Sequence, residues 1–180
     1  TVATSIGDEI VDGPYPWLFP FVDRLNLVRV AETIVEGRWT GRTIGNGTPR
    51  YLASENLGKE VVLGGFGVPD DVILLVCEGP VDWIKMDYYG SPVGISAVAT
   101  MGTAYTDDQV FQLLKLQQRV SKTYILFDRE ALSSQLRLAD ELEAHSKKPV
   151  QTLQLPQPFD DPGQMTADAV RRLLRVGRCG

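Results

Sequence analysis

The residues best placed to do chemistry in this chain are five carboxylates that follow apolar segments from residue 71 onward: Glu78, Asp82, Asp128, Glu130 and Asp161. Carboxylates that are held close together repel one another, and each raises the pKa of the others. A hard divalent cation relieves that repulsion, because Mg²⁺ prefers oxygen ligands supplied by a few carboxylates and by substrate phosphates. The pattern therefore predicts a site for Mg²⁺ or Mn²⁺ that acts on a phosphate-containing substrate.

Each carboxylate also has a purely structural interpretation. Asp82 can complement the dipole at a helix N-terminus, the segment 128–130 is compatible with a solvated turn, and Asp161 followed by proline is a common turn sequence. Glu78 is harder to explain in this way, because a helix at this point would normally begin with Ser, Asp or Asn. The prediction of a shared site depends on the joint position of all five residues.

The elements that would position these residues alternate between strands and helices from Asp71 onward. The predicted strands are 72–77, 94–99, 123–127 and 150–155, and the predicted helices are 80–89, 106–117, 131–145 and 166–175. Such alternation predicts an α/β fold with a mainly parallel, four-stranded central sheet flanked by helices. Ligands of these sheets bind beyond the carboxyl ends of the strands, which is where the five acids fall.

Two further expectations concern the helix 131–145 and the first part of the chain. Leu132, Leu136, Ala139 and Leu142 recur at helical spacing and are predicted to form the buried face of that helix. Residues 1–70 are rich in Gly and Pro and contain several short apolar runs. They predict a small, mostly β N-terminal subdomain.

Composition narrows the classes of protein. Apolar residues make up 43% of the 180 residues, enough for a normal core, and no apolar run approaches the length of a membrane span. No secretory signal is visible, so we expect a cytoplasmic protein. The two cysteines and one histidine are too few for a zinc site, and we expect Cys77 to be buried and reduced.

The net charge of -5 is not that of a general nucleic-acid binder, although arginines gather around residues 38–50.

Short motifs in the second part of the chain occur in an order that a known family shares. Residues 76–82 form a hydrophobic strand that ends in Glu-Gly and is followed by Asp, and residues 97–104 contain a Gly-Thr-Ala loop of small residues. Residues 124–128 are a strand that ends in Asp, and residues 155–162 contain Leu-Pro and then Asp-Pro. These motifs resemble those of the Toprim catalytic domain of bacterial-type and phage-type DNA primases.

The resemblance extends upstream, because Phe-Pro-Phe at 19–21 and Pro-Arg-Tyr-Leu at 49–52 resemble stretches that precede the Toprim fold in these primases. It covers roughly residues 17 to 175. It implies a basic, primase-like subdomain over residues 1–70 and a Toprim domain with a C-terminal helix over residues 71–180. The implied activity is metal-dependent, template-directed synthesis of short RNA primers on single-stranded DNA during DNA replication.

The resemblance also implies roles for individual residues and partners. Glu78, Asp128 and Glu130 would be catalytic, and the ligands of Mg²⁺ or Mn²⁺ would be Glu78, Asp82, Asp128, Glu130 and Asp161. Nucleic acid or nucleotide would be bound by Arg38, Arg42 and Arg50. The implied partners are a single-stranded DNA template, ribonucleoside triphosphates, and a replicative helicase or a separate zinc-binding module.

Two departures from the family pattern keep other functions open. The second acidic motif is Asp128-Arg129-Glu130 where the family has Asp-x-Asp, and a positive charge at Arg129 would weaken metal binding. Gly163 and Gln164 stand where the family usually carries another acid. One alternative is a Toprim nuclease, which would use the same acids and a water nucleophile. The other is a degenerate Toprim module that binds nucleic acid or a replication partner.

Overall fold

In a computed structural model, the chain forms two compact units, Thr1–Gly58 and Lys59–Gly180. The structure describes the backbone of residues 61–179 and the side chains of residues 61–175; in the first unit it describes only the strands. Each unit is considered by itself. The assignment of residues 1–70 to a primase-like subdomain and of residues 71–180 to a Toprim domain stays a prediction.

The described part of the first unit consists of short antiparallel strands. β1 pairs with β2, β5 pairs with β6, and a three-stranded sheet has the order β3-β4-β7. Their bounds are β1 Thr4–Ile6, β2 Glu9–Val11, β3 Trp17–Phe21, β4 Val28–Glu32, β5 Ile34–Val35, β6 Arg38–Trp39 and β7 Tyr51–Ala53. Antiparallel pairing of neighbouring short strands is what the prediction of a small β unit requires.

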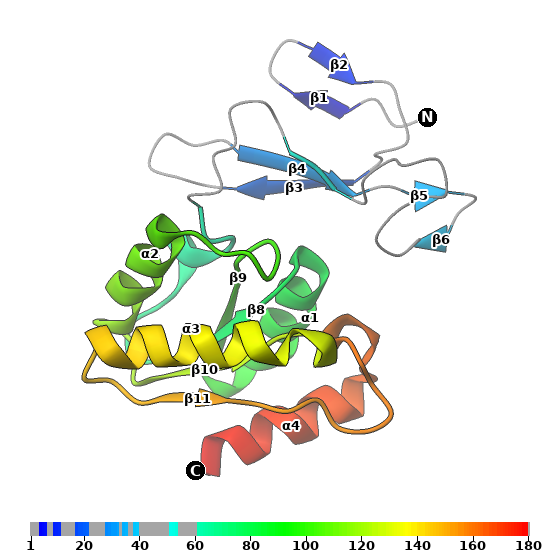
Figure 1. The fold of residues 1–180 in the computed structure, drawn as a ribbon. Coiled ribbons are helices and arrows are strands. Elements are labelled where there is room, and N and C mark those ends of the chain that lie inside the picture. The colour runs from blue at the N-terminus through cyan, green and yellow to red at the C-terminus, as the bar shows by residue number, and fades with distance from the viewer. Residues whose placement is uncertain are drawn as a thin grey trace. The chain divides into compact units, whose positions relative to one another are not determined.

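The second unit is an α/β fold around a four-stranded sheet of order β11-β10-β8-β9, in which every neighbouring pair is parallel (Figure 1). This confirms the predicted fold class. The strands are β8 Ile73–Cys77, β9 Ile95–Ala99, β10 Lys122–Leu126 and β11 Val150–Thr152. The helices are α1 Pro80–Gly90, α2 Asp107–Gln117, α3 Leu132–His145 and α4 Ala167–Cys179.

Helices cover both faces of this sheet, because alternate side chains of each strand point to opposite faces. Leu74, Val76 and Ile125 pack with α2 and α3 on one face. Leu75 and Cys77 pack with α1 and α4 on the other. The continuous apolar sequence of β8 is typical of a strand buried on both sides. Cys77 is a buried free thiol, as predicted.

The predicted buried face of α3 is wrong in its first two turns. The buried residues are Gln135, Leu138, Ala139 and Leu142, whereas Leu132 and Leu136 are each 46% exposed. The physical reason is that the side-chain amide of Gln135 completes two backbone hydrogen bonds at the end of the sheet, with Phe127 N–H and Leu153 O. Pairing these two buried backbone groups determines which face of α3 turns toward the sheet, and it outweighs the burial of Leu132 and Leu136.

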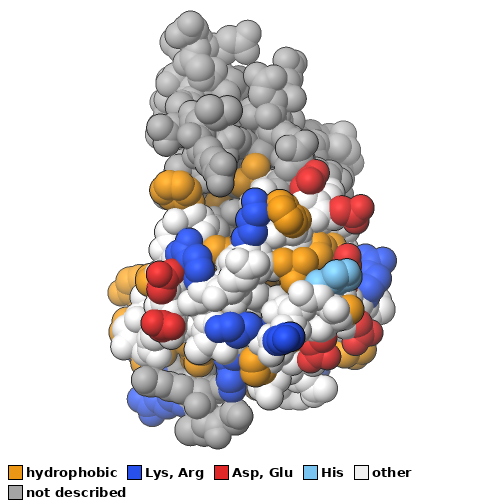
Figure 2. Space-filling model, turned by 90° about the vertical axis from the view of Figure 1, so that its left-hand side faces the viewer, with side chains coloured by type: hydrophobic (Ala, Val, Ile, Leu, Met, Phe, Trp, Pro, Cys, Tyr) orange, Lys and Arg blue, Asp and Glu red, His pale blue; other side chains and the backbone are white. Residues whose placement is uncertain are grey.

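Helix α3 ends on the side of the second unit where the strands of the sheet begin. Here cations bind nearby oxygen atoms: Arg119 Nε donates to Asp70 at 2.7 Å, and Lys148 Nζ donates to the carbonyl of Val120 at 2.9 Å. Figure 2 shows Lys and Arg side chains on this side interspersed with acidic and apolar ones. None of the described helices is long and apolar enough to cross a membrane.

Candidate metal centre

The central strands β8 and β10 form a topological switch point. They are neighbours in the sheet, yet α1 leaves β8 on one face and α3 leaves β10 on the other. In open parallel sheets, ligands bind in the crevice that such a reversal creates at the carboxyl ends. Glu78 directly follows β8, and Asp128 lies two residues beyond the end of β10. The topology therefore brings two of the predicted site residues to the expected crevice.

Three aspartates form a compact cluster at this edge. Asp82, Asp128 and Asp161 each offer a carboxylate oxygen, and these oxygens all lie within 4.8 Å of one another. Asp82 is only 7% exposed, and the other two are half-buried. They come from three separate segments of the chain: the first turn of α1, the turn after β10, and the loop after β11.

Asp82 is held by backbone donors on both of its oxygens. Oδ2 accepts from Gly79 N–H at 3.0 Å, which closes the first turn of α1 in the manner of a capping box. Oδ1 accepts from Gly163 N–H at 2.8 Å. Asp82 thus stabilises the N-terminus of α1, as its structural interpretation predicted. This role is compatible with metal binding. A carboxylate offers about four lone-pair positions, so two accepted hydrogen bonds leave room for a cation.

Gly163 joins two members of the cluster. Its N–H is shared between Asp82 Oδ1 and Asp161 Oδ1. A Cβ at this position would lie 2.8 Å from Asp161 Oδ1 and 3.0 Å from Asp82 Oδ1, so a side chain would push the two carboxylates away. In the sequence, Gly163 stands only where the resembled family usually carries another acid. The Asp-Pro-Gly turn sequence was the signal that could have indicated its role.

Lys85, which the sequence did not indicate, fixes the same segment from α1. Its ammonium donates to the carbonyl of Gly163 and, at 2.7 Å, to the carbonyl of Met165. Lys85 lies one turn after Asp82 on the helix, so a single helix supplies both a cluster carboxylate and the cation that holds the opposite loop. Only the fold places residues 82–85 against residues 163–165.

The three carboxylates of the cluster repel one another. Burial raises the pKa of Asp82 well above its usual range, and the negative charges of Asp161 and Asp128 raise it further. The hydrogen bond from Gly79 N–H acts in the opposite direction but does not reverse the shift. A divalent cation among the three oxygens would remove this repulsion.

The geometry fits a hard divalent ion. Two ligand oxygens of one octahedral Mg²⁺ lie at most about 4.2 Å apart, since each Mg–O bond is about 2.1 Å. Only one pair among three ligands can be opposite, and adjacent ligand oxygens lie about 3.0 Å apart, so a pair at the 4.8 Å limit of the cluster would have to approach by up to about 1.8 Å. All three ligands are carboxylates, which favours Mg²⁺ or Mn²⁺ over softer metals.

The other predicted site residues lie outside this cluster or outside the described residues. Glu78 is half-buried at the end of β8, and Glu130 is exposed in the short 3₁₀ helix Arg129–Ala131. Their catalytic and metal-binding roles stay predictions. Arg38 begins β6, of which only the backbone is described, and Arg42 and Arg50 fall outside the described residues.

The Gly-Thr-Ala loop folds back over the end of β8. Gly102 N–H donates to the carbonyl of Glu78 at 3.0 Å, and Thr100 Oγ1 donates to the carbonyl of Gly102 at 3.0 Å. Met101 has a φ of 64° and Gly102 a φ of 124°, which makes the reversal tight. The buried amide of Gln109 donates to the carbonyl of Thr100 at 2.7 Å. The loop is therefore fixed beside Glu78.

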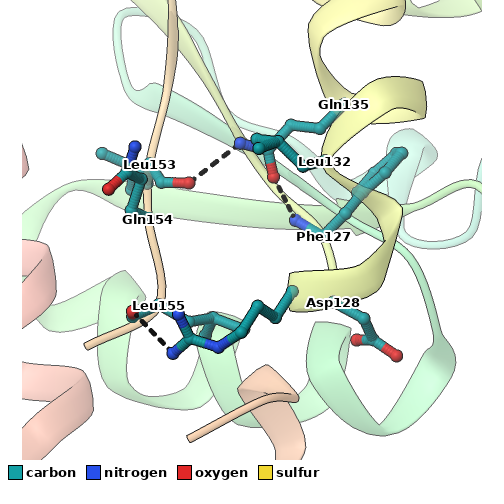
Figure 3. Close-up of a pocket in the computed structure, with 8 residues that line it drawn as sticks. Phe127, Asp128, Leu132, Gln135, Leu153, Gln154 and Leu155 are labelled. Carbon is teal, nitrogen blue, oxygen red and sulfur yellow. Dashed lines mark hydrogen bonds between the residues drawn. The ribbon is translucent and has the colours of Figure 1, made fainter. Parts of the chain in front are cut away.

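A pocket of about 160 Å³ opens on the other side of Asp128. Its lining residues lie between the ends of β10 and β11 and the start of α3: Phe127, Asp128, Arg129, Leu132, Gln135, Leu153, Gln154 and Leu155. Figure 3 shows the Gln135 amide bridging Phe127 N–H, at 2.8 Å, and Leu153 O, at 2.9 Å. This bridge replaces direct strand pairing, so β11 ends at Thr152 and not at 155 as predicted.

Comparisons with known proteins give a structural likeness without a sequence-level one. No family model matches the chain, and no curated protein matches it in sequence. The fold is similar to the primase fragment of the bacteriophage T7 primase-helicase protein, with a TM-score of 0.62 and 10% identity over 88% of this chain and 61% of that one. This chain thus spans less than two thirds of the T7 fragment.

A second solved structure is also similar in fold and equally low in sequence identity. It is a bacteriophage T7 lagging-strand DNA polymerase interacting with primase domains of two gp4 subunits, bound to an RNA/DNA hybrid and dTTP. The TM-score is 0.59, with 10% identity over 86% of this chain and 71% of that one. At this level of identity the likeness establishes a shared fold, and that fold is the one found in phage primase domains.

Proposed function

We propose that this chain is the catalytic core of a DNA primase of the Toprim type, which joins ribonucleotides into short RNA primers on single-stranded DNA. The single observation that carries the proposal is the Asp82–Asp128–Asp161 cluster at the switch point of the sheet. The likeness of the fold to phage primase domains supports it. The sequence motifs that resemble those of primases lie at the carboxyl ends of the four strands of the second unit.

In this proposal, Asp82, Asp128 and Asp161 hold Mg²⁺ or Mn²⁺. The bound ion supplies charge neutralisation for a triphosphate and for the leaving group. Glu78 acts beside this site as a base or as a further ligand, and the exposed Glu130 is a peripheral ligand whose loss weakens metal binding less than the loss of an aspartate of the cluster. Arg38, Arg42 and Arg50 contact the template or the incoming ribonucleoside triphosphate, for which guanidinium groups are suited. A replicative helicase or a separate zinc-binding module is the proposed protein partner.

The test is primer synthesis by the full chain. Single-stranded DNA, labelled ribonucleoside triphosphates and Mg²⁺ or Mn²⁺ are incubated with the wild-type protein and with Glu78→Gln, and the products are separated on a denaturing gel. We expect short labelled products that require metal and disappear in the variant. Lys85 and the arginines of the first unit are left intact, so that loss of product reports on Glu78.

Two other results would contradict the proposal and favour a different function. Cleavage of the template without synthesis would indicate a Toprim nuclease, since the same cluster can serve a water nucleophile. Neither activity, together with unaltered thermal stability on addition of Mn²⁺, would indicate a degenerate module that binds nucleic acid or a replication partner. Thermal unfolding reports the metal-binding part of this second result, because a ligand that binds the folded state raises its stability.

A further inference from the structure

The loop that carries Asp161 is tied to the turn after β10 by one side chain, Arg129. Its Nε donates to Asp160 Oδ1 at 2.7 Å, and its Nη2 donates to the carbonyls of Phe159 at 2.6 Å and Leu155 at 3.2 Å. The backbone N–H of Arg129 donates to the carbonyl of Asp160 at 2.9 Å. Four hydrogen bonds from one residue therefore span residues 155–160.

These contacts need the shape of a guanidinium group. Its donors lie in a rigid plane and can reach several acceptors at once, whereas the ammonium group of lysine acts as a single point. The ion pair alone contributes little, since Arg129 is 38% and Asp160 74% exposed. The bonds to backbone carbonyls are what fix the path of the loop.

The position of Asp161 follows from this docking. Asp161 directly follows Asp160, and on its other side Lys85 holds the carbonyls of Gly163 and Met165. The segment is thus fixed at both ends, by a cation from the β10 turn and by a cation from α1.

We propose that Arg129 is a positioning residue of the metal centre: it docks the loop 155–160 so that the Asp161 carboxylate meets those of Asp82 and Asp128. This inference deepens the proposed function and rests on its metal site. It also reverses the expectation drawn from the sequence, in which the charge of Arg129 would weaken metal binding. Asp160 and two loop carbonyls engage the guanidinium group.

The test measures Mn²⁺ binding directly, by the electron paramagnetic resonance signal of free Mn²⁺ during titration of the full chain. Arg129→Ala should bind Mn²⁺ about 10-fold more weakly, a loss typical of residues that orient metal ligands. Arg129→Lys should recover part of that loss, and Asp160→Asn should show a smaller one. The matched control is Arg137→Ala, an exposed arginine that donates to the hydroxyl of Tyr105 at 3.0 Å and should bind as the wild type does.

The possible results distinguish a failure of this inference from a failure of the proposed function. Wild-type affinity in Arg129→Ala, with the circular dichroism spectrum unchanged, overturns the role of Arg129 and leaves the metal site standing. No binding of Mn²⁺ by the wild type overturns both. An equal loss in Arg137→Ala also overturns the inference, because the effect would then be general. If Arg129→Ala does not fold, wild-type affinity in both Arg129→Lys and Asp160→Asn is the contradicting result.

Discussion

The turn after β10 and the loop after β11 each carry two acidic residues, and they use them in the same unequal way. Asp128 and Asp161 enter the metal-compatible cluster, whereas Glu130 is exposed and Asp160 pairs with Arg129. The inner acids are half-buried and face like charges. The outer acids face solvent or a cation. Position in the backbone, and not the presence of a carboxylate alone, decides which acid of each pair joins the cluster.

The largest expected effect comes from neutralising the inner acids of these two segments, compared with neutralising the outer ones. Asp128→Asn and Asp161→Asn should each weaken Mn²⁺ binding by more than about 100-fold, because each removes a charged ligand, which costs more than the 10–100-fold loss of a supporting residue. Glu130→Gln and Asp160→Asn should stay within about 10-fold of the wild type. Isothermal titration calorimetry with Mn²⁺ measures all four variants. Equal losses for inner and outer residues would show that the comparison is wrong.

A smaller effect is expected at Gly163, where the two inner oxygens share one backbone donor. Gly163→Ala should weaken Mn²⁺ binding by about 10-fold, since its Cβ would displace both carboxylates. The control is Gly67→Ala, which places a Cβ where no atom lies within 4 Å and should change nothing. Retention of wild-type affinity in Gly163→Ala would mean that the carboxylates reach the metal without this donor.

The smallest effect is a pH dependence that originates in Asp82. Because its pKa in the folded state is raised, the folded protein binds a proton that the unfolded chain has already released. The metal-free protein should therefore lose stability as pH rises from the usual aspartate range through the raised pKa. Over the same window Mn²⁺ should raise the melting temperature progressively more, since the ion competes with that proton. Thermal unfolding of the wild type and of Asp82→Asn checks both trends, which should be absent from the variant.

The sequence predicted the features that depend on regular periodicity. Four strands, four helices and their parallel order follow from continuous apolar segments alternating with amphipathic ones. The position of acids at the carboxyl ends follows from that order. The position of Asp82 in the cluster also follows, because a residue one turn into α1 lies beside the end of β8. Its role as a metal ligand stays a prediction.

Features that depend on side chains bound to distant backbone could not be predicted in this way. Gln135 faces the sheet instead of Leu132 because its amide joins Phe127, 8 residues before it, to Leu153, 18 residues after it. Lys85 reaches Met165 across 80 residues. Periodicity reports only on the average polarity of a helix face, so a buried polar side chain that satisfies backbone groups looks like an error in the pattern.

The most direct test of the account is to locate the ion. Crystals of the full chain grown with Mn²⁺ are measured near the manganese absorption edge, and the anomalous difference map is inspected. The account predicts a peak bonded to oxygens of Asp82, Asp128 and Asp161. A peak bonded instead to Glu130 or Asp160, or a map without a peak among the three inner carboxylates at saturating Mn²⁺, would contradict it.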